Sequence, residues 1–248
     1  MSMKLYVTAA TLLIWTGPAS ASPAARSFGS AFFLSRNGDG RIELLGTAVI
    51  WLLLCMSAVA IGLAIAMATN NRRQSILPDG FVEEMRSDIA AKRFKEAMGR
   101  ADECESFIGR IMGESMRQAP FGWNAVIRTL EQASEERTVA RLRRIEVLNT
   151  IGQVSPMIGL FGTVYGMILA FTAIVASGGA ADPVMLAGGI GTALTTTFWG
   201  LVVAIPSLAA CAMLRGHIDS TTAEATLAAE ELLGGFRPKK GNGGASAS

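Results

Sequence analysis

The sequence predicts an all-α integral membrane protein with three transmembrane helices and a charged cytoplasmic helical domain, in which transmembrane helices 2 and 3 are extended. Half of the 248 residues are hydrophobic and the mean hydropathy is +0.39, which is high for a water-soluble domain. The apolar residues fall in long blocks, and charged residues concentrate between the first two of the membrane-length blocks. A net charge of +2, without a dense basic patch, argues against nucleic-acid binding.

Residues 1–21 are typical of a secretory signal peptide. Lys4 precedes an apolar run that ends at Trp15, and residues 19–21 read Ala-Ser-Ala, the small-x-small pattern of a cleavage site. About 11 apolar residues are too few to cross a hydrocarbon core of about 30 Å, which favours cleavage over an additional membrane helix. Residues 22–43 then form a predicted periplasmic segment.

The first predicted transmembrane helix covers residues 44–69, which contain no charged side chain. Arg72 and Arg73 follow it, and the positive-inside rule places that end in the cytoplasm. Residues 70–146 change to amphipathic helical patterns whose charges nearly balance, as in a solvated helical domain. We then expect a second transmembrane helix, a periplasmic turn, a third transmembrane helix and a cytoplasmic tail, at residues 147–176, 177–183, 184–214 and 215–248.

Both later spans carry a stripe of small or weakly polar residues at alternating spacings of four and three, which places each stripe on one helix face. The stripes comprise Gly152, Pro156, Gly159, Thr163, Gly166, Ala170, Ala173 and Ser177, and Ala193, Thr197, Gly200, Ala204, Ser207 and Cys211. Such faces allow close packing of membrane helices, and they also suit the lining of a narrow polar passage. A threonine hydroxyl can order water or bond to its own backbone, so the pattern leaves both interpretations open.

Two blocks of this sequence resemble a known family at matched separation. LNTIGQVSPMIGLFGTVYGMILAF and GGIGTALTTTFWGLVVAIPS are similar to the ExbB/TolQ/MotA proton-channel family, nearest its ExbB and TolQ branch, over about residues 44–220. The resemblance implies a ring, a homopentamer, around helices of an ExbD- or TolR-like partner in the bacterial inner membrane. It also implies proton-driven work on transport or the envelope, through a TonB-like or TolA-like periplasm-spanning protein.

The resemblance also implies which residues line the pore. By position, the family's pore threonines fall on Thr163 and Thr197. Beside them lie Gly159, Gly166, Ala193 and Gly200, with Thr192 and Thr196 as a second tier. This chain departs from the family at residues 189–194, which read GIGTAL where many relatives carry a glutamate, so Thr192 stands in place of the inner pore carboxylate.

The spans themselves contain no Asp, Glu, Lys, Arg or His. Proton relays through membranes normally use ionisable side chains, and a threonine hydroxyl does not change its charge near neutral pH. The titrating group is therefore expected on another chain, and the resemblance implies an aspartate on the single membrane helix of the partner.

Two other functions stay open at this level. The missing glutamate leaves open a non-conducting membrane scaffold of the same fold. A flagellar-type stator subunit would normally have a fourth span, so the three expected spans argue against it. No phosphate-binding GxxxxGK[ST] or esterase GxSxG pattern occurs, and His217 and the three cysteines have no metal-ligand spacing. We therefore expect no enzymatic activity, cofactor or metal.

Overall fold

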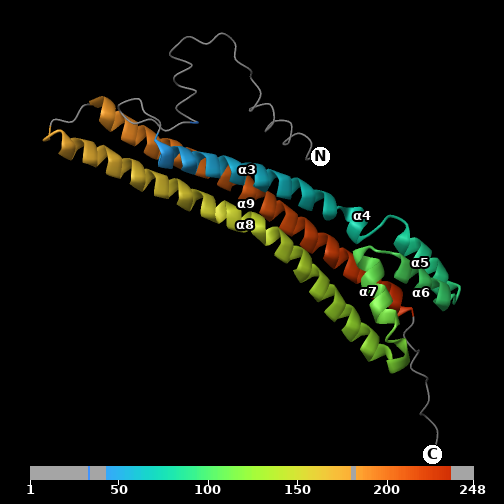
Figure 1. Cartoon of the computed structure of the whole chain (residues 1–248). Coiled ribbons are helices and arrows are strands. Elements are labelled where there is room, and N and C mark those ends of the chain that lie inside the picture. The colour runs from blue at the N-terminus through green and yellow to red at the C-terminus, as the bar shows by residue number, and fades with distance from the viewer. Residues whose placement is uncertain (1–32, 34–42, 180–182, 236–248) are drawn as a thin grey trace, which may run out of the picture. The chain divides into compact units, whose positions relative to one another are not determined.

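The computed structural model describes residues 33, 43–179 and 183–235, and these are almost entirely helical, without a β-strand among them (Figure 1). The predicted all-α membrane fold is confirmed. The predicted signal peptide, most of residues 22–43 and residues 236–248 lie outside the described part. The elements are α3 (Leu44–Asn70), α4 (Arg73–Ile76), α5 (Phe81–Ala90), α6 (Phe94–Glu103), α7 (Phe107–Met116), the 3-10 turn η1 (Ala119–Phe121), α8 (Trp123–Ala176) and α9 (Pro183–Gly234).

Three of these helices, α3, α8 and α9, are long and apolar enough to cross a membrane. Even the shortest, α3 with 27 residues, spans about 40 Å at 1.5 Å per residue, which exceeds a hydrocarbon core of about 30 Å. In the most apolar 18-residue stretch of each helix, only 22% is buried within the protein for α3 and for α8, and 33% for α9. The remaining apolar surface therefore has to be covered by lipid or by other chains.

The second and third long helices continue well beyond their apolar stretches. α8 has 54 residues and passes through Pro156 without a break, and α9 has 52 residues and passes through Pro206. A membrane helix tolerates proline because neighbouring groups satisfy the freed carbonyl. Residues 215–234, which the sequence assigned to a tail, are helical as the final part of α9.

Short breakers define the helix ends. Gly122 has a φ of 97° and precedes α8, while Gly178 and Gly179, with φ of 65° and 95°, follow it. Positive φ is strained for residues that carry a Cβ, so glycine suits each turn. Pro183 begins α9, where its missing N–H costs no helical hydrogen bond.

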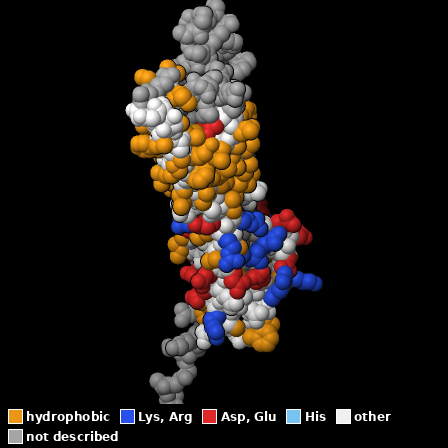
Figure 2. Space-filling model, turned by 60° about the vertical axis from the view of Figure 1, so that its left-hand side comes forward, with side chains coloured by type: hydrophobic (Ala, Val, Ile, Leu, Met, Phe, Trp, Pro, Cys, Tyr) orange, Lys and Arg blue, Asp and Glu red, His pale blue; other side chains and the backbone are white. Residues whose placement is uncertain are grey.

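The chain divides into two compact units, and the long helices run from one into the other. Of the described residues, the first unit contains 33, 43–53, 158–179 and 183–200, and the second contains 54–157 and 201–235. Figure 2 shows charged side chains gathered on one part of the surface and hydrophobic side chains covering another.

The second unit has a hydrophobic core made by helices that are distant in sequence. Residues of α5, α6 and α7 pack with the start of α8, and the end of α9 joins them through Ala225, Ala229, Leu232 and Leu233. The charged helical domain is therefore completed by the last turns of α9. The sequence of this last part of α9 did not predict its place in the domain, because two alanines and one pair of leucines give a weak amphipathic pattern.

Ion pairs lie around this core. Both guanidinium Nη atoms of Arg73 bind the Glu224 carboxylate, at 2.8 and 2.6 Å, and this pair lowers the pKa of Glu224 from its ordinary value. Asp88 is buried and bonds to Arg93 at 2.8 Å and to Arg100 at 3.0 Å. The Arg73–Glu224 pair is exposed, so solvent screens its attraction, whereas removing Arg93 or Arg100 would leave the buried Asp88 carboxylate less well compensated.

Candidate functional site

The candidate site is the face along which α8 and α9 meet in the first unit. Gly159, Gly162 and Gly166 are buried on α8, and Gly189 and Ala193 are buried on α9. A Cβ placed on Gly166 would lie 2.6 Å from the Gly189 carbonyl oxygen and 2.8 Å from the Ala193 nitrogen. Real Cβ atoms do not approach other atoms so closely, so the two backbones touch here because glycine has no side chain.

The contact is reciprocal and continues along both helices. A Cβ on Gly189 would lie 2.8 Å from the Gly166 carbonyl oxygen and 2.9 Å from the Ala170 nitrogen. About two turns before Gly166 on α8, a Cβ on Gly159 would lie 3.0 Å from the Thr196 carbonyl oxygen and 3.4 Å from Cα of Gly200. The small residues of the two stripes thus pack against each other within one protomer.

Gly162 belongs to this contact but was not among the predicted site residues. A Cβ on Gly162 would collide with the Thr196 side chain. Gly162 and Gly166 are four residues apart, and GxxxG is a known packing motif of membrane helices. That motif was the signal that could have identified Gly162 from the sequence.

Thr192 and Thr196, the predicted second tier, lie inside the protomer, with exposed fractions of 5% and 0%. The Thr196 hydroxyl donates to carbonyl oxygens of its own helix, at 3.0 Å from Ala193 and 3.1 Å from Thr192, and lies 3.3 Å from the Gly159 oxygen of α8. The Thr192 hydroxyl donates to the Gly188 oxygen at 3.1 Å. Both hydroxyls satisfy backbone carbonyl groups, and that of Thr196 also links α9 to α8.

Thr163 and Thr197 differ from the other six predicted pore residues because they are only half-buried. The Thr163 hydroxyl donates to the Leu160 oxygen at 2.6 Å, and the Thr197 hydroxyl lies 3.4 Å from the Gly159 oxygen. At 100° per residue, Thr163 lies about 40° from Gly159 around the α8 axis, at the margin of the contact. After donating, each hydroxyl still has lone pairs that can accept a hydrogen bond from water.

The structure therefore brings the eight predicted residues to one helix contact and separates them into two groups. Gly159, Gly166, Ala193 and Gly200 are buried against the neighbouring helix, together with the two second-tier threonines. Thr163 and Thr197 retain exposed surface on the same contact. Their lining of a pore stays a prediction.

One carboxylate lies directly beside the first span. Glu43 precedes α3, its carbonyl accepts a hydrogen bond from the Thr47 N–H at 3.1 Å, and its side chain is only 7% exposed. The hydroxyl of Tyr165 on α8 hydrogen-bonds to the Glu43 side chain. Tyr165 lies about 160° from Thr163 around α8, so this carboxylate contacts a different face of α8 from the one that carries Thr163.

Metal ligands do not gather in the part of the chain that the structure describes. No group of three or more His, Cys, Asp or Glu side chains there could hold an ion. The three cysteines lie apart as free thiols, and Cys211 packs in a small cluster with Ile145 and Ile218 in the second unit.

Comparison with known proteins gives a consistent match. Residues 82–226 match the MotA/TolQ/ExbB proton channel family. The chain is 40% identical over 80 residues to Biopolymer transport protein exbB1 of Vibrio cholerae, covering 32% of this chain and 35% of that protein. It is 38% identical over 100 residues to the Tol-Pal system protein TolQ of Haemophilus influenzae, covering 40% and 39%.

A third relative is the Biopolymer transport protein ExbB of Xanthomonas campestris pv. campestris strain B100. It is 38% identical over 97 residues, which cover 39% of this chain and 36% of that protein. The chain thus spans between a third and two fifths of the length of these three curated relatives.

Proposed function

Because the chain belongs to the MotA/TolQ/ExbB proton channel family, we propose that it is the ring-forming subunit of a proton-driven motor in the bacterial inner membrane. The family match over residues 82–226 carries this proposal, since it includes two of the three candidate spans and most of the charged domain. The proposed activity is the coupling of proton flow to transport or envelope work, without enzymatic turnover.

The ring is supported by apolar surface that one protomer leaves uncovered. In the first unit, seven large side chains of α8 and α9 are between 47% and 67% exposed: Leu160, Phe161, Val164, Ile168, Phe171, Leu194 and Phe198. Copies of the chain, together with lipid, would cover this surface, and the proposed assembly is a homopentamer. Thr163 and Thr197 would then face the central passage and order water in it.

A partner is required because no ionisable residue lies within the spans. A proton charge at the middle of a membrane is expensive unless a carboxylate or an imidazole can hold it. We propose that an ExbD- or TolR-like single-span protein supplies this group as an aspartate. A TonB-like or TolA-like protein would then carry the motion across the periplasm.

The proposed topology places the N-terminus in the periplasm after signal-peptide cleavage and residues 70–146 in the cytoplasm. Cysteines introduced at Ser87 and Ser177, both exposed, test this arrangement. An impermeant thiol reagent added to whole cells should label the Ser177→Cys variant and spare the Ser87→Cys variant. The opposite labelling would contradict the topology.

Proton flux in liposomes tests the function. The chain alone should conduct slowly, and flux should appear when the single-span partner is added and vanish when the partner's membrane aspartate becomes asparagine. Rapid flux from the chain alone would refute the need for a partner. The absence of flux with the partner bound would instead favour a non-conducting scaffold, which the buried Thr192 in place of the family glutamate keeps as the second candidate.

A further inference from the structure

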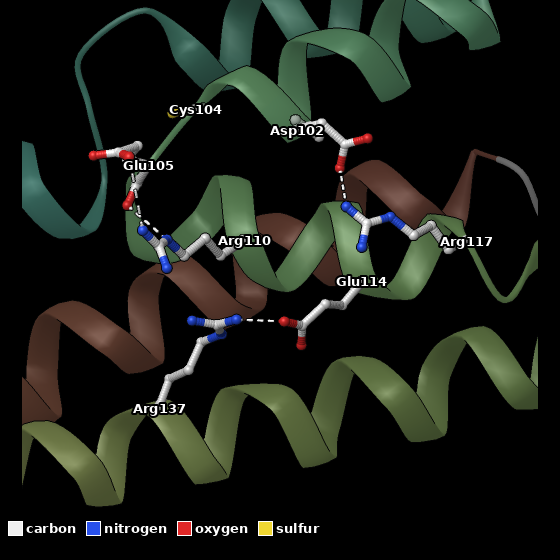
Figure 3. A pocket seen from close by; sticks show the side chains of 8 residues that line it. Asp102, Cys104, Glu105, Arg110, Glu114, Arg117 and Arg137 are labelled. Atoms are coloured by element: carbon white, nitrogen blue, oxygen red, sulfur yellow. Dashed lines mark hydrogen bonds and ion pairs between the residues drawn. The ribbon is translucent and has the colours of Figure 1, made fainter.

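Four arginines of the second unit gather where α7 meets α8. Arg137, Arg141 and Arg144 are spaced by four and three residues, so they lie within about 60° of one another on α8. Arg110 comes from α7, and Figure 3 shows it with Arg137, which reaches from α8 to Glu114. We call these four residues the arginine cluster.

Arg141 is the centre of the arginine cluster and is half-buried. Its Nη1 donates to the side-chain oxygen of Asn71 at 2.9 Å, and its guanidinium lies 5.9 Å from the centre of the Phe107 ring. Among the described residues, no carboxylate lies within ion-pair distance of Arg141. Its guanidinium is thus held by an amide and an aromatic ring, which position it but do not neutralise its charge.

The cluster as a whole has more positive than negative charge. Arg137 pairs with Glu114, and Arg110 lies 4.0 Å from the largely exposed Glu105. Four arginines therefore face two carboxylates, which leaves a net charge of about +2. Burial, followed by the neighbouring Arg144, Arg110 and Arg137, lowers the pKa of Arg141 from its ordinary value. An anion that bound between these groups would relieve this repulsion.

The first apolar helix fixes the position of the cluster relative to the membrane. Asn71 follows the last residue of α3 directly, and its amide donates to the Met67 oxygen at 2.9 Å while its oxygen accepts from Arg141. Asn71 is only 7% exposed, so this link is a buried part of the fold. The guanidinium of Arg141 consequently lies level with the end of the membrane-length apolar helix, where lipid headgroups begin.

We propose that the arginine cluster binds the phosphate group of an anionic phospholipid at the membrane surface. Guanidinium groups suit this ligand because their planar donors can bond two phosphate oxygens at once. The cytoplasmic leaflet follows from the proposed topology, whereas the site itself does not depend on proton conduction.

Two members of the cluster, Arg110 and Arg144, are exposed, as is Arg143 on the same helix. Arg143 differs from them in position, because it lies roughly 130° around α8 from the centre of the cluster. Since Arg143 and Arg144 are adjacent, they lie at nearly the same depth relative to the membrane. Comparison of the two separates a defined site from general attraction to a charged surface.

The test uses the full-length protein in detergent micelles with native mass spectrometry. Dioleoylphosphatidylglycerol is titrated into the wild-type protein and into the Arg144→Gln, Arg141→Gln and Arg143→Gln variants, and dioleoylphosphatidylcholine serves as the neutral lipid. Among the described residues Arg144 makes no ion pair or hydrogen bond that the substitution would remove, so Arg144→Gln should fold normally. A basic residue near a charged surface corresponds to about a fivefold change in affinity.

We expect phosphatidylglycerol adducts on the wild-type protein, an approximately fivefold weaker affinity for Arg144→Gln and for Arg141→Gln, and less than a twofold change for Arg143→Gln. An equal loss in Arg143→Gln and Arg144→Gln, or equal binding of the two lipids, would overturn the proposal. Calorimetric titration with inorganic phosphate distinguishes the source of the anion. Phosphate binding that depends on Arg144, without selective phosphatidylglycerol adducts, would overturn the lipid assignment.

Discussion

Replacing Gly166 by alanine tests whether backbone contact between α8 and α9 holds the first unit together. The new Cβ would lie 2.6 Å from the Gly189 oxygen, about 0.8 Å closer than the 3.4 Å at which ordinary contact begins. The two atoms nearest to this new Cβ, the Gly189 oxygen and the Ala193 nitrogen, are both backbone atoms. No side chain can rotate away, so the helices themselves have to separate.

The expected cost follows from two opposing effects. Alanine favours a helix over glycine by up to about 1 kcal/mol, whereas forcing a methyl group into a packed contact costs about 1–3 kcal/mol. Gly191→Ala and Gly62→Ala receive only the favourable effect, since a Cβ at either position meets nothing within 4 Å. We therefore expect Gly166→Ala to be less stable than these controls by roughly 1–3 kcal/mol.

The free energy of unfolding of the three variants can be compared by titrating sodium dodecyl sulfate into mixed micelles. Circular dichroism then follows the loss of helix, and the controls account for any change in intrinsic helix preference. If Gly166→Ala were as stable as Gly191→Ala, the close contact between the two backbones would not stabilise the fold. The same result would remove the structural reason for the small-residue stripes.

Two further substitutions test the passage and the charged domain. Thr163→Leu should block proton-coupled work, while native mass spectrometry should show that the ring still assembles. The control is Thr172→Leu, which lies about 180° away on α8, has the same type of backbone hydrogen bond and should leave the work unchanged. Unchanged activity of an assembled Thr163→Leu ring would disprove the pore assignment. Arg73 lowers the pKa of Glu224, so their pair stabilises the fold at neutral pH and loses this effect as the pH falls below 4.5 and through the folded-state pKa. The difference in melting temperature between wild type and Glu224→Gln should therefore shrink on acidification. The control is Glu230→Gln, at an exposed position. If Glu224→Gln changed the melting temperature at neutral pH no more than Glu230→Gln does, the pair would not stabilise the fold.

The sequence by itself determined the features that depend on neighbouring residues. The length of each apolar block decides whether it can cross a bilayer, so the three membrane-length helices could be predicted without any contact information. The spacing of small residues likewise placed Gly159, Thr163 and Gly166 on one helix face. The missing ionisable residues within the spans are also a property of the sequence alone.

Only the tertiary structure decided which groups meet across the fold. The register between α8 and α9 places Gly166 against Gly189 and buries Thr196, while Thr163 stays half-buried. The sequence could not give this register, because a periodic pattern within one helix contains no information about how far that helix is shifted along its neighbour. For the same reason the sequence did not reveal the bond from Arg141 to Asn71, 70 residues apart. Such pairs form because packing brings distant turns of the chain into contact, and that choice depends on all the helices together.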